Sequence, residues 1–337
     1  MILNFEHIAS SHCENGATMN MLRYFKADVD EPLTFGISSG LFFGHLPFMK
    51  LNYMPVTTFR GLPGIIFSRA CKNLGFEYTT KKFTDPKKSM QELDRILDLG
   101  IPVGLQVGLF HLTYFPAEYR MHYNMHNMVV YGRENGIYNV SDSVIEKTET
   151  ITYEDLMRVR FSKGPFAPKG KMYYITKSPA EFDYNKAIRK GLSKTAYEMV
   201  GIPFPLVGVK GIRYLSRKLR VWPQKLGNLT ASRYLGQLIL MQEEVGTGGS
   251  GYRFIYGAFL KEAAKRFNNP EMNELSKEMG ITANKWREFS YLGSRNCKGR
   301  GEPEHSYDFL ADMLLDIADR EEKIFKKLKT LIPKIII

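Results

Sequence analysis

The sequence is poor in cysteine: it has three among 337 residues, and no two of them form a Cys-x-x-Cys pair. Cys13, Cys71 and Cys297 are odd in number and far apart. A domain held by disulfides has many closely spaced cysteines, and a structural zinc site needs paired ligands. The count therefore argues against both, and the sequence suggests neither a metal nor a bound organic cofactor.

The chain also lacks an uninterrupted apolar run long enough to cross a membrane. Its first residues, MILNFEHIASSHC, contain neither the basic segment nor the full apolar segment of a secretory signal. We therefore expect a cytoplasmic protein. With 44% hydrophobic and 13% aromatic residues, the chain is long enough for a large core and for about two domains.

Acidic residues are scarce in one part of a chain whose net charge is +12 and whose pI is near 9.4. Between residues 185 and 225 the only acid is Glu198, and the stretch is either a solvated basic face or a docking surface for phosphate, anionic lipid or an acidic carrier protein. No nucleic-acid-binding motif accompanies it, so nucleic acid is not the expected partner. Its basic residues are Lys186, Arg189, Lys190, Lys194, Lys210, Arg213, Arg217, Lys218, Arg220 and Lys225.

The pattern of apolar residues changes near residue 180. Before it, residues 85–100 predict an amphipathic helix, residues 126–143 predict two strands joined by a turn at 134–136, and residues 170–177 predict a further strand. After it come a basic segment and then long helical patterns, in residues 229–245, 252–267, 271–293 and 306–331. We expect an α+β fold with one domain over 1–180 and a basic linker with an α-helical domain over 181–337.

Cys13 lies in the polar stretch SSHCENGATMN, just before apolar residues at helical spacing. The thiol is therefore expected near a helix N-terminus, where the positive end of the helix dipole favours the nucleophilic thiolate. A buried structural thiol is the alternative. Cys71 has the surroundings of a core residue, and Cys297, in the basic segment SRNCKGRGE, is a weaker candidate nucleophile.

Thiol catalysis needs a base and a third group that orients the base. His126 opens the first predicted strand of the hairpin and Asp142 ends the second, and an antiparallel hairpin brings its outer ends together. We therefore predict a set of Cys13, His126 and Asp142. The aromatic-rich residues between His111 and His122 either line a substrate pocket or pack, and packing is the favoured expectation.

This order of a helix-borne Cys, a strand-borne His and an Asp on the next strand resembles that of papain-like cysteine peptidases and their transferase relatives. HCENGA at 12–17, HNMVVYG at 126–132 and VSDS at 140–143 resemble the N-terminal domain of the butirosin-biosynthesis protein H family. The segment at 246–264 is similar to the helical domain that follows there. The resemblance implies a helix bearing the Cys, packed on an antiparallel sheet.

The resemblance also implies an acyl or aminoacyl transferase. The acyl group would come from the phosphopantetheine thioester of an acidic acyl carrier protein and pass to an amine or hydroxyl of a small acceptor. Cys13 would hold the acyl group as a thioester, His126 would act as base and then acid, and Asp142 would hold the imidazole. Papain-like peptidases have a Gln shortly before the Cys as an oxyanion donor; here His7 or His12 would replace it, alongside the Cys13 amide.

The glycine-rich segment GTGGSG at 246–251 lacks the Gly-Lys-Ser/Thr ending of a phosphate-binding loop and follows a predicted helix, so nucleotide binding is not expected. It is either a flexible turn or a loop that helps to bind the acceptor, with Glu243 and Glu244 before it and Arg253 and Tyr256 after it.

Two other functions fit the same residues: hydrolysis of a small peptide or amide by the same three side chains, and a binding protein that keeps the fold without turnover. The C-terminal segment KIFKKLKTLIPKIII either packs on the helical domain or makes a peripheral contact with anionic lipid.

Overall fold

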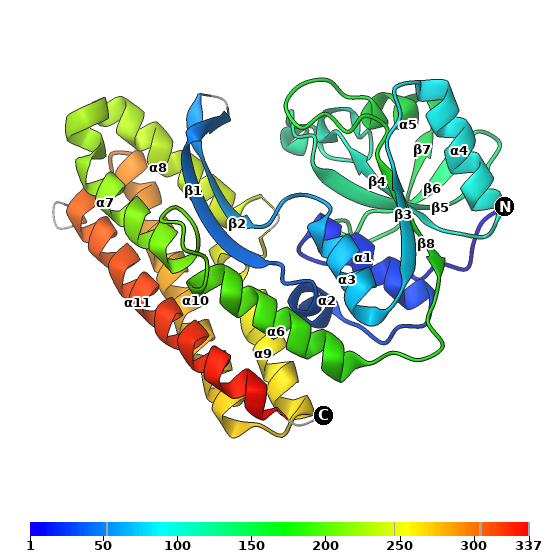
Figure 1. The fold of residues 1–337 in the computed structure, drawn as a ribbon. Helices are drawn as coiled ribbons and strands as arrows, with labels where there is room; N and C mark the ends of the chain where they lie inside the picture. Colours follow the sequence, from blue (N-terminus) through cyan, green and yellow to red (C-terminus); the bar gives the residue numbers. More distant parts are fainter. Residues whose placement is uncertain (52, 246, 303–304, 336–337) are drawn as a thin grey trace. The chain divides into compact units, whose positions relative to one another are not determined.

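The computed structural model describes residues 1–51, 53–245, 247–302 and 305–335. The chain forms two compact units, the first containing residues 1–34 and 63–184 and the second containing residues 35–62 and 185–337 (Figure 1). The sequence predicts a single boundary near residue 180. That expectation is wrong for residues 35–62, which precede the boundary and yet belong to the second unit.

The first unit is built on a six-stranded sheet in the order β3-β8-β4-β5-β6-β7, in which every neighbouring pair is antiparallel. Its strands are β3 (Glu77–Lys81), β4 (Val103–Val107), β5 (His126–Glu134), β6 (Ile137–Ser141), β7 (Glu149–Thr152) and β8 (Met172–Lys177). The predicted hairpin of β5 and β6 is confirmed. Asn135 and Gly136 form its two-residue turn with φ values of 50° and 77°, a conformation that Asn and Gly adopt readily.

Helices cover both faces of this sheet: α1 (Cys13–Tyr24), α3 (Ile65–Leu74), α4 (Pro86–Asp98) and α5 (Tyr153–Arg160). Tyr138 and Ser141 point to opposite faces because side chains alternate along β6. The Tyr138 hydroxyl donates to Asp94 on α4 at 2.8 Å, and Asn20 on α1 donates to Ser141 at 3.4 Å. The helices α1 and α4 therefore lie on opposite faces of the sheet. The predicted helix at 85–100 is α4, capped by Asp85.

The second unit combines a two-stranded hairpin, β1 (Leu41–Leu51) and β2 (Met54–Arg60), with helices. Phe43 on β1 and Phe59 on β2 pack on the buried Trp286, with ring centroids 6.0 and 5.4 Å away. This aromatic contact explains why residues 35–62 join the second unit. The helices are α6 (Tyr184–Val200), α7 (Gly208–Leu226), α8 (Asn228–Glu243), α9 (Arg253–Arg266), α10 (Pro270–Cys297) and α11 (Tyr307–Leu331), and α2 (Glu31–Ile37) spans the junction of the two units.

The expected basic linker is wrong, because α6 and α7 occupy most of residues 184–226. Lys and Arg favour helices, and each of these helices buries an apolar stripe under its basic residues. Arg213 pairs with Asp319 at 2.6 Å and with Glu322, while Arg220 pairs with Asp308 at 3.3 Å. The predicted α+β class, with a Cys-bearing helix on an antiparallel sheet and a helical region after it, is confirmed.

The C-terminal segment is mostly helical, since α11 continues to Leu331. Phe325, Leu328 and Leu331 on it are buried, as is Ile335, which fits the packing alternative. Residues 336–337 of this segment lie outside the described residues. No helix in the described ranges has the length and apolar character required to cross a membrane.

Candidate active site

Cys13 is the first residue of α1, as the sequence predicts. His12 caps the helix: its backbone is extended, and its Nδ1 accepts a hydrogen bond from the Asn15 amide at 3.2 Å. The Cys13 side chain is only 7% exposed. Its position in the first turn places the sulfur at the positive end of the helix dipole, where a negative charge is stabilised.

Gly16 lets this first turn approach the end of β6. An added Cβ at residue 16 would lie 1.9 Å from Ser10 Oγ and 2.3 Å from Ser143 Oγ, closer than any real contact allows. The Ser10 amide donates to the Ser143 carbonyl at 2.6 Å, and Ser143 Oγ donates to the Cys13 carbonyl at 3.5 Å. The glycine in SSHCENGATMN therefore fixes α1 beside Asp142, which immediately precedes Ser143.

His126 and Asp142 meet as the hairpin geometry predicts. His126 Nε2 lies 2.6 Å from Asp142 Oδ2, and both side chains are buried. The strands are in register with Val129 opposite Ser141, so that Asp142 is diagonally across from His126 at the same end of the hairpin. A buried carboxylate at this distance orients the imidazole and stabilises its protonated form.

The proton affinity of His126 results from opposing effects. Burial lowers its pKa, but the charge of Asp142 and the hydrogen bond to Asp142, together with the hydrogen bond and charge of Cys13, raise the pKa to about 10. His126 therefore interacts with Cys13 as well as with Asp142. The structure brings the three predicted residues together as a buried Cys, His and Asp set, which is an arrangement suited to a thiolate nucleophile.

Tyr114 is a fourth member of this cluster that the sequence analysis missed. Its hydroxyl donates to Asp142 Oδ2 at 2.9 Å and also lies 3.3 Å from Met128 Sδ. Burial, and then the neighbouring Asp142, hold the pKa of Tyr114 well above its ordinary value. The next residue, Phe115, places its ring edge to face with His126 at 5.5 Å. No local pattern in the sequence marks this hydrogen bond, although a tyrosine inside a protein usually has a hydrogen-bond partner.

The predicted oxyanion donors have other partners. His7 Nδ1 is 2.8 Å from Ser141 Oγ and His7 Nε2 is 3.1 Å from the Ile145 carbonyl, so both ring nitrogens of His7 are engaged outside the cluster. The expectation for His7 is therefore wrong. His12 uses Nδ1 to cap α1 and lies beside Cys13 in the chain, which makes its first role the placement of that helix.

The predicted acceptor residues lie in the core of the second unit, whereas Cys13, His126 and Asp142 belong to the first. Arg253 is fully buried and forms a bidentate pair with Glu321 at 2.8 and 3.0 Å. Tyr256 is fully buried and packs on Phe325. Buried side chains with these partners have no surface for an acceptor, so the expectation for both is wrong.

Glu243 holds the glycine-rich loop itself. Its Oε2 accepts from the Ser250 amide at 3.1 Å and its Oε1 accepts from Ser290 Oγ at 2.6 Å. Gly249 and Gly251 have φ values of 84° and 55°, and Gly246 lies outside the described residues. The loop is thus a tightly bonded turn before α9, and the role proposed for Glu243 and Glu244 in acceptor binding has no support in these contacts.

The other two cysteines lie in different surroundings. Cys71 is a core residue, as predicted, and burial raises its pKa. Cys297 is half-buried, its thiol lies 3.4 Å from the Ser232 carbonyl, and burial raises its pKa despite the basic neighbours in the sequence. Within the part of the chain that the structure describes, no group of three or more His, Cys, Asp and Glu side chains is arranged to hold a metal ion.

Comparisons with known families match nearly the whole chain. Residues 12–143 match the domain described as butirosin biosynthesis protein H, N-terminal, and residues 154–328 match a domain of unknown function, DUF4872. The chain belongs to the DUF4872 family, with a butirosin biosynthesis protein H domain at its N-terminus. Cys13, His126 and Asp142 all lie inside the butirosin biosynthesis protein H match, and Arg253 lies inside the DUF4872 match.

Among solved structures, the chain is similar to a putative C39-like peptidase from Bacillus anthracis, with 16% identity and a TM-score of 0.36. The similarity covers 53% of this chain and 98% of that one. A search of curated proteins found no match.

Proposed function

We propose that this DUF4872-family chain is a cysteine-dependent acyl or aminoacyl transferase that works through a thioester on Cys13. The observation that carries the proposal is the contact of 2.6 Å between His126 Nε2 and Asp142 Oδ2 next to Cys13 at the start of α1. A core cysteine needs neither a histidine nor a buried carboxylate beside it, whereas both serve an activated thiolate, the histidine as its base and the carboxylate as the group that orients the histidine.

In the first half-reaction, the Cys13 thiolate attacks the carbonyl carbon of a thioester donor. The carbon bond to the donor sulfur then breaks, and protonated His126 gives its proton to the departing thiolate. In the second, the acceptor amine or hydroxyl attacks the Cys13 thioester and gives a proton to His126, and the Cys13 sulfur leaves as the thiolate. Asp142 keeps His126 oriented throughout, and the Cys13 amide with the N-terminus of α1 stabilises the oxyanion.

The test is intact-protein mass spectrometry after exposure to a panel of acyl thioesters and acyl carrier proteins. We expect a mass gain equal to the acyl group, lost on treatment with hydroxylamine, in the wild type and in Cys71→Ser and Cys297→Ser, but not in Cys13→Ser. An acceptor that discharges the adduct into a new amide or ester distinguishes transfer from hydrolysis, in which water alone discharges it. A mass gain retained by Cys13→Ser would contradict the proposal, because another residue would then hold the acyl group. The absence of a mass gain with every donor would contradict it too, and would favour a binding protein.

We also propose that the exposed basic residues of α6 and α7 attract an acidic carrier protein. Because Arg213 and Arg220 are paired with acids of α11, the test uses Arg217, which is exposed, and Lys218, which lies over the Tyr214 ring. Arg217→Glu with Lys218→Glu should slow acyl transfer from the carrier but not from a small thioester, more so at low salt. The matched control, Lys261→Glu with Lys265→Glu on α9, should slow neither transfer from the carrier nor transfer from the small thioester. If the two pairs of replacements slow transfer from the carrier equally, the docking proposal is wrong.

A further inference from the structure

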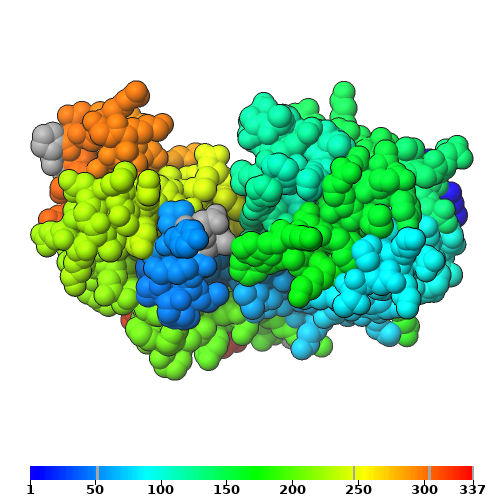
Figure 2. Space-filling model, turned by 90° about the horizontal axis from the view of Figure 1, so that it is seen from above, coloured from blue at the N-terminus to red at the C-terminus, as the bar shows by residue number. Residues whose placement is uncertain are grey.

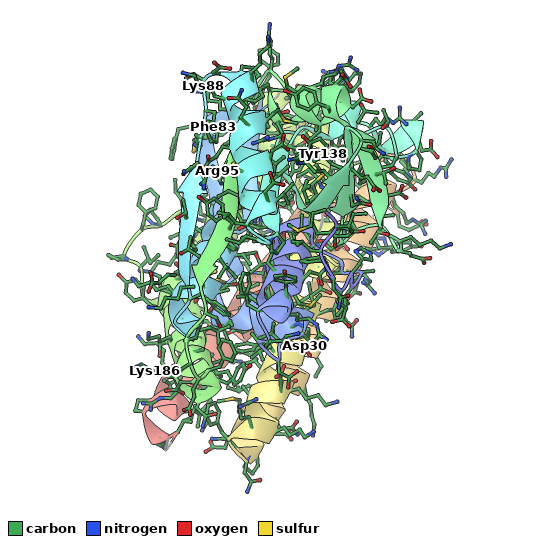
Figure 3. The ribbon with its side chains drawn as sticks, turned by 90° about the vertical axis from the view of Figure 1, so that its right-hand side faces the viewer. Asp30, Phe83, Lys88, Arg95, Tyr138 and Lys186 are labelled. Carbon is green, nitrogen blue, oxygen red and sulfur yellow. The ribbon has the colours of Figure 1, made fainter. Side chains whose placement is uncertain are left out.

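A lysine-lined cavity lies in the first unit, separate from the cysteine cluster. It has a volume of about 290 Å³, and its lining comes from the end of β3, the start of α4 and the segment before β8. Figure 3 shows Phe83 and Lys88 at the same end of α4, with Arg95 farther along that helix. In Figure 2 the cyan surface of the β3–α4 region borders the green surface of the segment before β8. The lining residues are Lys82, Phe83, Thr84, Asp85, Lys88 and Lys169.

The charges around this cavity are unbalanced. Lys82, Lys88 and Lys169 are exposed and have no carboxylate partner among residues 1–51, 53–245, 247–302 and 305–335. The neighbouring Lys81, by contrast, pairs with Glu92 at 2.7 Å. The one acid in the lining, Asp85, accepts from the amides of Lys87 and Lys88 as the cap of α4. Three ammonium groups against one carboxylate leave a net positive cavity that fits an anion.

Two of these lysines occupy positions that local conformational stability disfavours. Lys88 lies in the first turn of α4, which has no acidic residue, although the positive end of a helix dipole disfavours a cation there. Lys169 has a φ of 51°, in the left-handed region that non-glycine residues rarely adopt, and its carbonyl accepts from the Phe83 amide at 2.9 Å. Such departures from local stability concentrate at binding sites.

The cavity shares one edge of the sheet with the cysteine cluster. Lys81 is opposite Met172, Met172 is opposite Leu105, and Val107 is opposite His126, so the end of β3 and the start of β5 lie at the same edge. Three strand spacings separate β3 from β5, or about 14 Å. The segment bearing Lys169 is also tied to the residues before His126, because Asn124 Nδ2 donates to the carbonyls of Lys163 and Pro165 at 3.0 Å.

We propose that this cavity binds a phosphate group of the thioester donor, an inference that rests on the proposed function. A phosphate needs several cations, and lysines bind it as mobile point charges. The half-buried Phe83 ring offers an apolar surface to the carbon chain next to the phosphate. In a phosphopantetheine thioester, the phosphate and the reacting carbonyl lie at opposite ends of an extended chain. Such a chain can run along the sheet edge, with its phosphate in the cavity near β3 and its carbonyl at Cys13 near β5.

The experiment compares two donors that differ only in the phosphate: acetyl-phosphopantetheine and acetyl-pantetheine. Acylation of Cys13 is followed by mass spectrometry at increasing donor concentration. In the wild type, the phosphorylated donor should half-saturate the reaction at a concentration at least tenfold lower. Replacing Lys82, Lys88 and Lys169 by Gln should abolish that preference and leave the reaction with acetyl-pantetheine unchanged. A preference that survives these replacements would overturn the proposal.

The matched control carries three Lys→Gln replacements in the same unit, outside the cavity, and it should retain the preference. These are Lys26, Lys72 and Lys177, all exposed. Acetyl-coenzyme A and an acetylated carrier protein serve as further donors. If the cavity variant is acylated more slowly by both, the two donors share the phosphopantetheine phosphate as the bound group; if it is acylated more slowly by only one, that donor is the source of the phosphate. If the rate of Cys13 acylation falls with neither donor, the proposal is overturned.

A binding measurement separates this proposal from the proposed function. Calorimetry on Cys13→Ser with phosphopantetheine and with pantetheine needs no acyl chemistry. Tighter binding of phosphopantetheine, lost in the cavity variant and kept in the control, would support the phosphate site even if no donor acylates Cys13. Equal binding of the two compounds would overturn the site while leaving an observed Cys13 adduct intact.

Discussion

The Tyr114 hydroxyl donates a hydrogen bond of 2.9 Å to Asp142 Oδ2, the same oxygen that lies 2.6 Å from His126 Nε2. One carboxylate oxygen is therefore shared by a tyrosine and a histidine; His126 and Asp142 are buried and Tyr114 is half-buried. The hydrogen bond from Tyr114 fixes this oxygen of Asp142 in place beside the imidazole. We infer that Tyr114 is a positioning residue, which acts on Cys13 through Asp142 and His126.

Replacement of Tyr114 by Phe should change the pH profile of Cys13 reactivity. The change removes a hydrogen bond to a charged group, worth about 1.5–3 kcal/mol, that holds Asp142 Oδ2 in place. A less firmly held carboxylate interacts less with His126, so the pKa of His126, which Asp142 raises, should fall. Less Cys13 is then held as the thiolate beside protonated His126, and iodoacetamide labelling of Cys13 near neutral pH, measured by mass spectrometry, should be slower.

The control for this prediction is Tyr138→Phe. Tyr138 also donates to a carboxylate, Asp94 on α4, at 2.8 Å, on the opposite face of the sheet from α1. Tyr138→Phe should therefore leave the pH profile of Cys13 labelling unchanged. If Tyr114→Phe lowers only the melting temperature and keeps the wild-type profile, Tyr114 has a packing role alone.

The raised pKa of His126 predicts a pH dependence of stability. The folded-state pKa of about 10 exceeds the ordinary value of 6.5, so the stabilisation is complete below about pH 6.5 and is lost as the pH rises toward 10. Asp142→Asn removes the charge that raises this pKa. The difference in the free energy of unfolding between wild type and Asp142→Asn should therefore narrow from pH 7 to pH 10, measured by denaturant unfolding.

Asp94→Asn provides the comparison for this stability series, because the partners of Asp94 are Tyr138 and Arg133 rather than a histidine in the part of the chain that the structure describes. The free energy of unfolding of Asp94→Asn should differ from that of the wild type by a nearly constant amount between pH 7 and pH 10. If the free energies of unfolding of wild type and Asp142→Asn differ by an amount that is constant or grows with pH, His126 is not held protonated in the folded protein.

The parts of the site that the sequence predicts depend on local signals. The Asn-Gly turn sets the pairing of β5 and β6 at its own end of the hairpin, and the outer ends of the hairpin, with His126 and Asp142, meet as an antiparallel pair requires. A bulge between Val130 and Gly132 shifts the register by one residue on the way, and the sequence does not predict that shift. The polar stretch before the helical pattern likewise places Cys13 at the start of α1. Each inference uses residues that are close in sequence, together with one geometric rule.

The parts that escape prediction depend on contacts between distant residues. Arg253 pairs with Glu321, which is 68 residues away, and nothing near Arg253 shows that it is buried. The hydrogen bond of Tyr114 to Asp142 joins residues 28 positions apart, and no local pattern around Tyr114 indicates it. The hairpin of β1 and β2 joins the second unit because its aromatic side chains reach Trp286, a contact without a local signature.

Replacement of Arg253 by Ala should destabilise the second unit. The change would leave Glu321 buried with an unpaired charge, at a cost of about 3–5 kcal/mol. Trp286 Nε1 also donates to Glu321, at 2.7 Å, so Arg253→Met with Glu321→Gln should recover much of the loss while keeping an acceptor for Trp286. The measurement is the free energy of unfolding in denaturant.

Arg213→Ala is the matched control for Arg253, since Arg213 pairs with Asp319 and Glu322 near the surface of the same unit. A partly exposed pair is worth about 1 kcal/mol or less, so this variant should stay near wild type. A cost for Arg253→Ala no larger than that of Arg213→Ala would show that the buried pair does not hold α9 to α11.

Replacement of Gly16 by Ala should disturb the cysteine cluster without changing any of its side chains. The new Cβ would meet Ser10 Oγ at 1.9 Å and Ser143 Oγ at 2.3 Å, so either α1 or the residues after Asp142 must move. Overpacking of this kind costs about 1–3 kcal/mol, and the movement separates Cys13 from His126 and Asp142. Iodoacetamide labelling of Cys13 should slow at neutral pH, where the thiolate depends on that contact.

Gly280 provides the control for Gly16, because it lies inside α10 and an added Cβ there meets nothing within 4 Å. Gly280→Ala should stabilise the helix by as much as about 1 kcal/mol and leave Cys13 labelling unchanged. Removing the obstructing side chains by Ser10→Gly and Ser143→Gly should restore labelling to Gly16→Ala if steric contact is the cause. Continued slow labelling in that triple variant would mean that Gly16 acts through helix propensity, and the close approach of α1 to β6 would not be what sets the reactivity of Cys13.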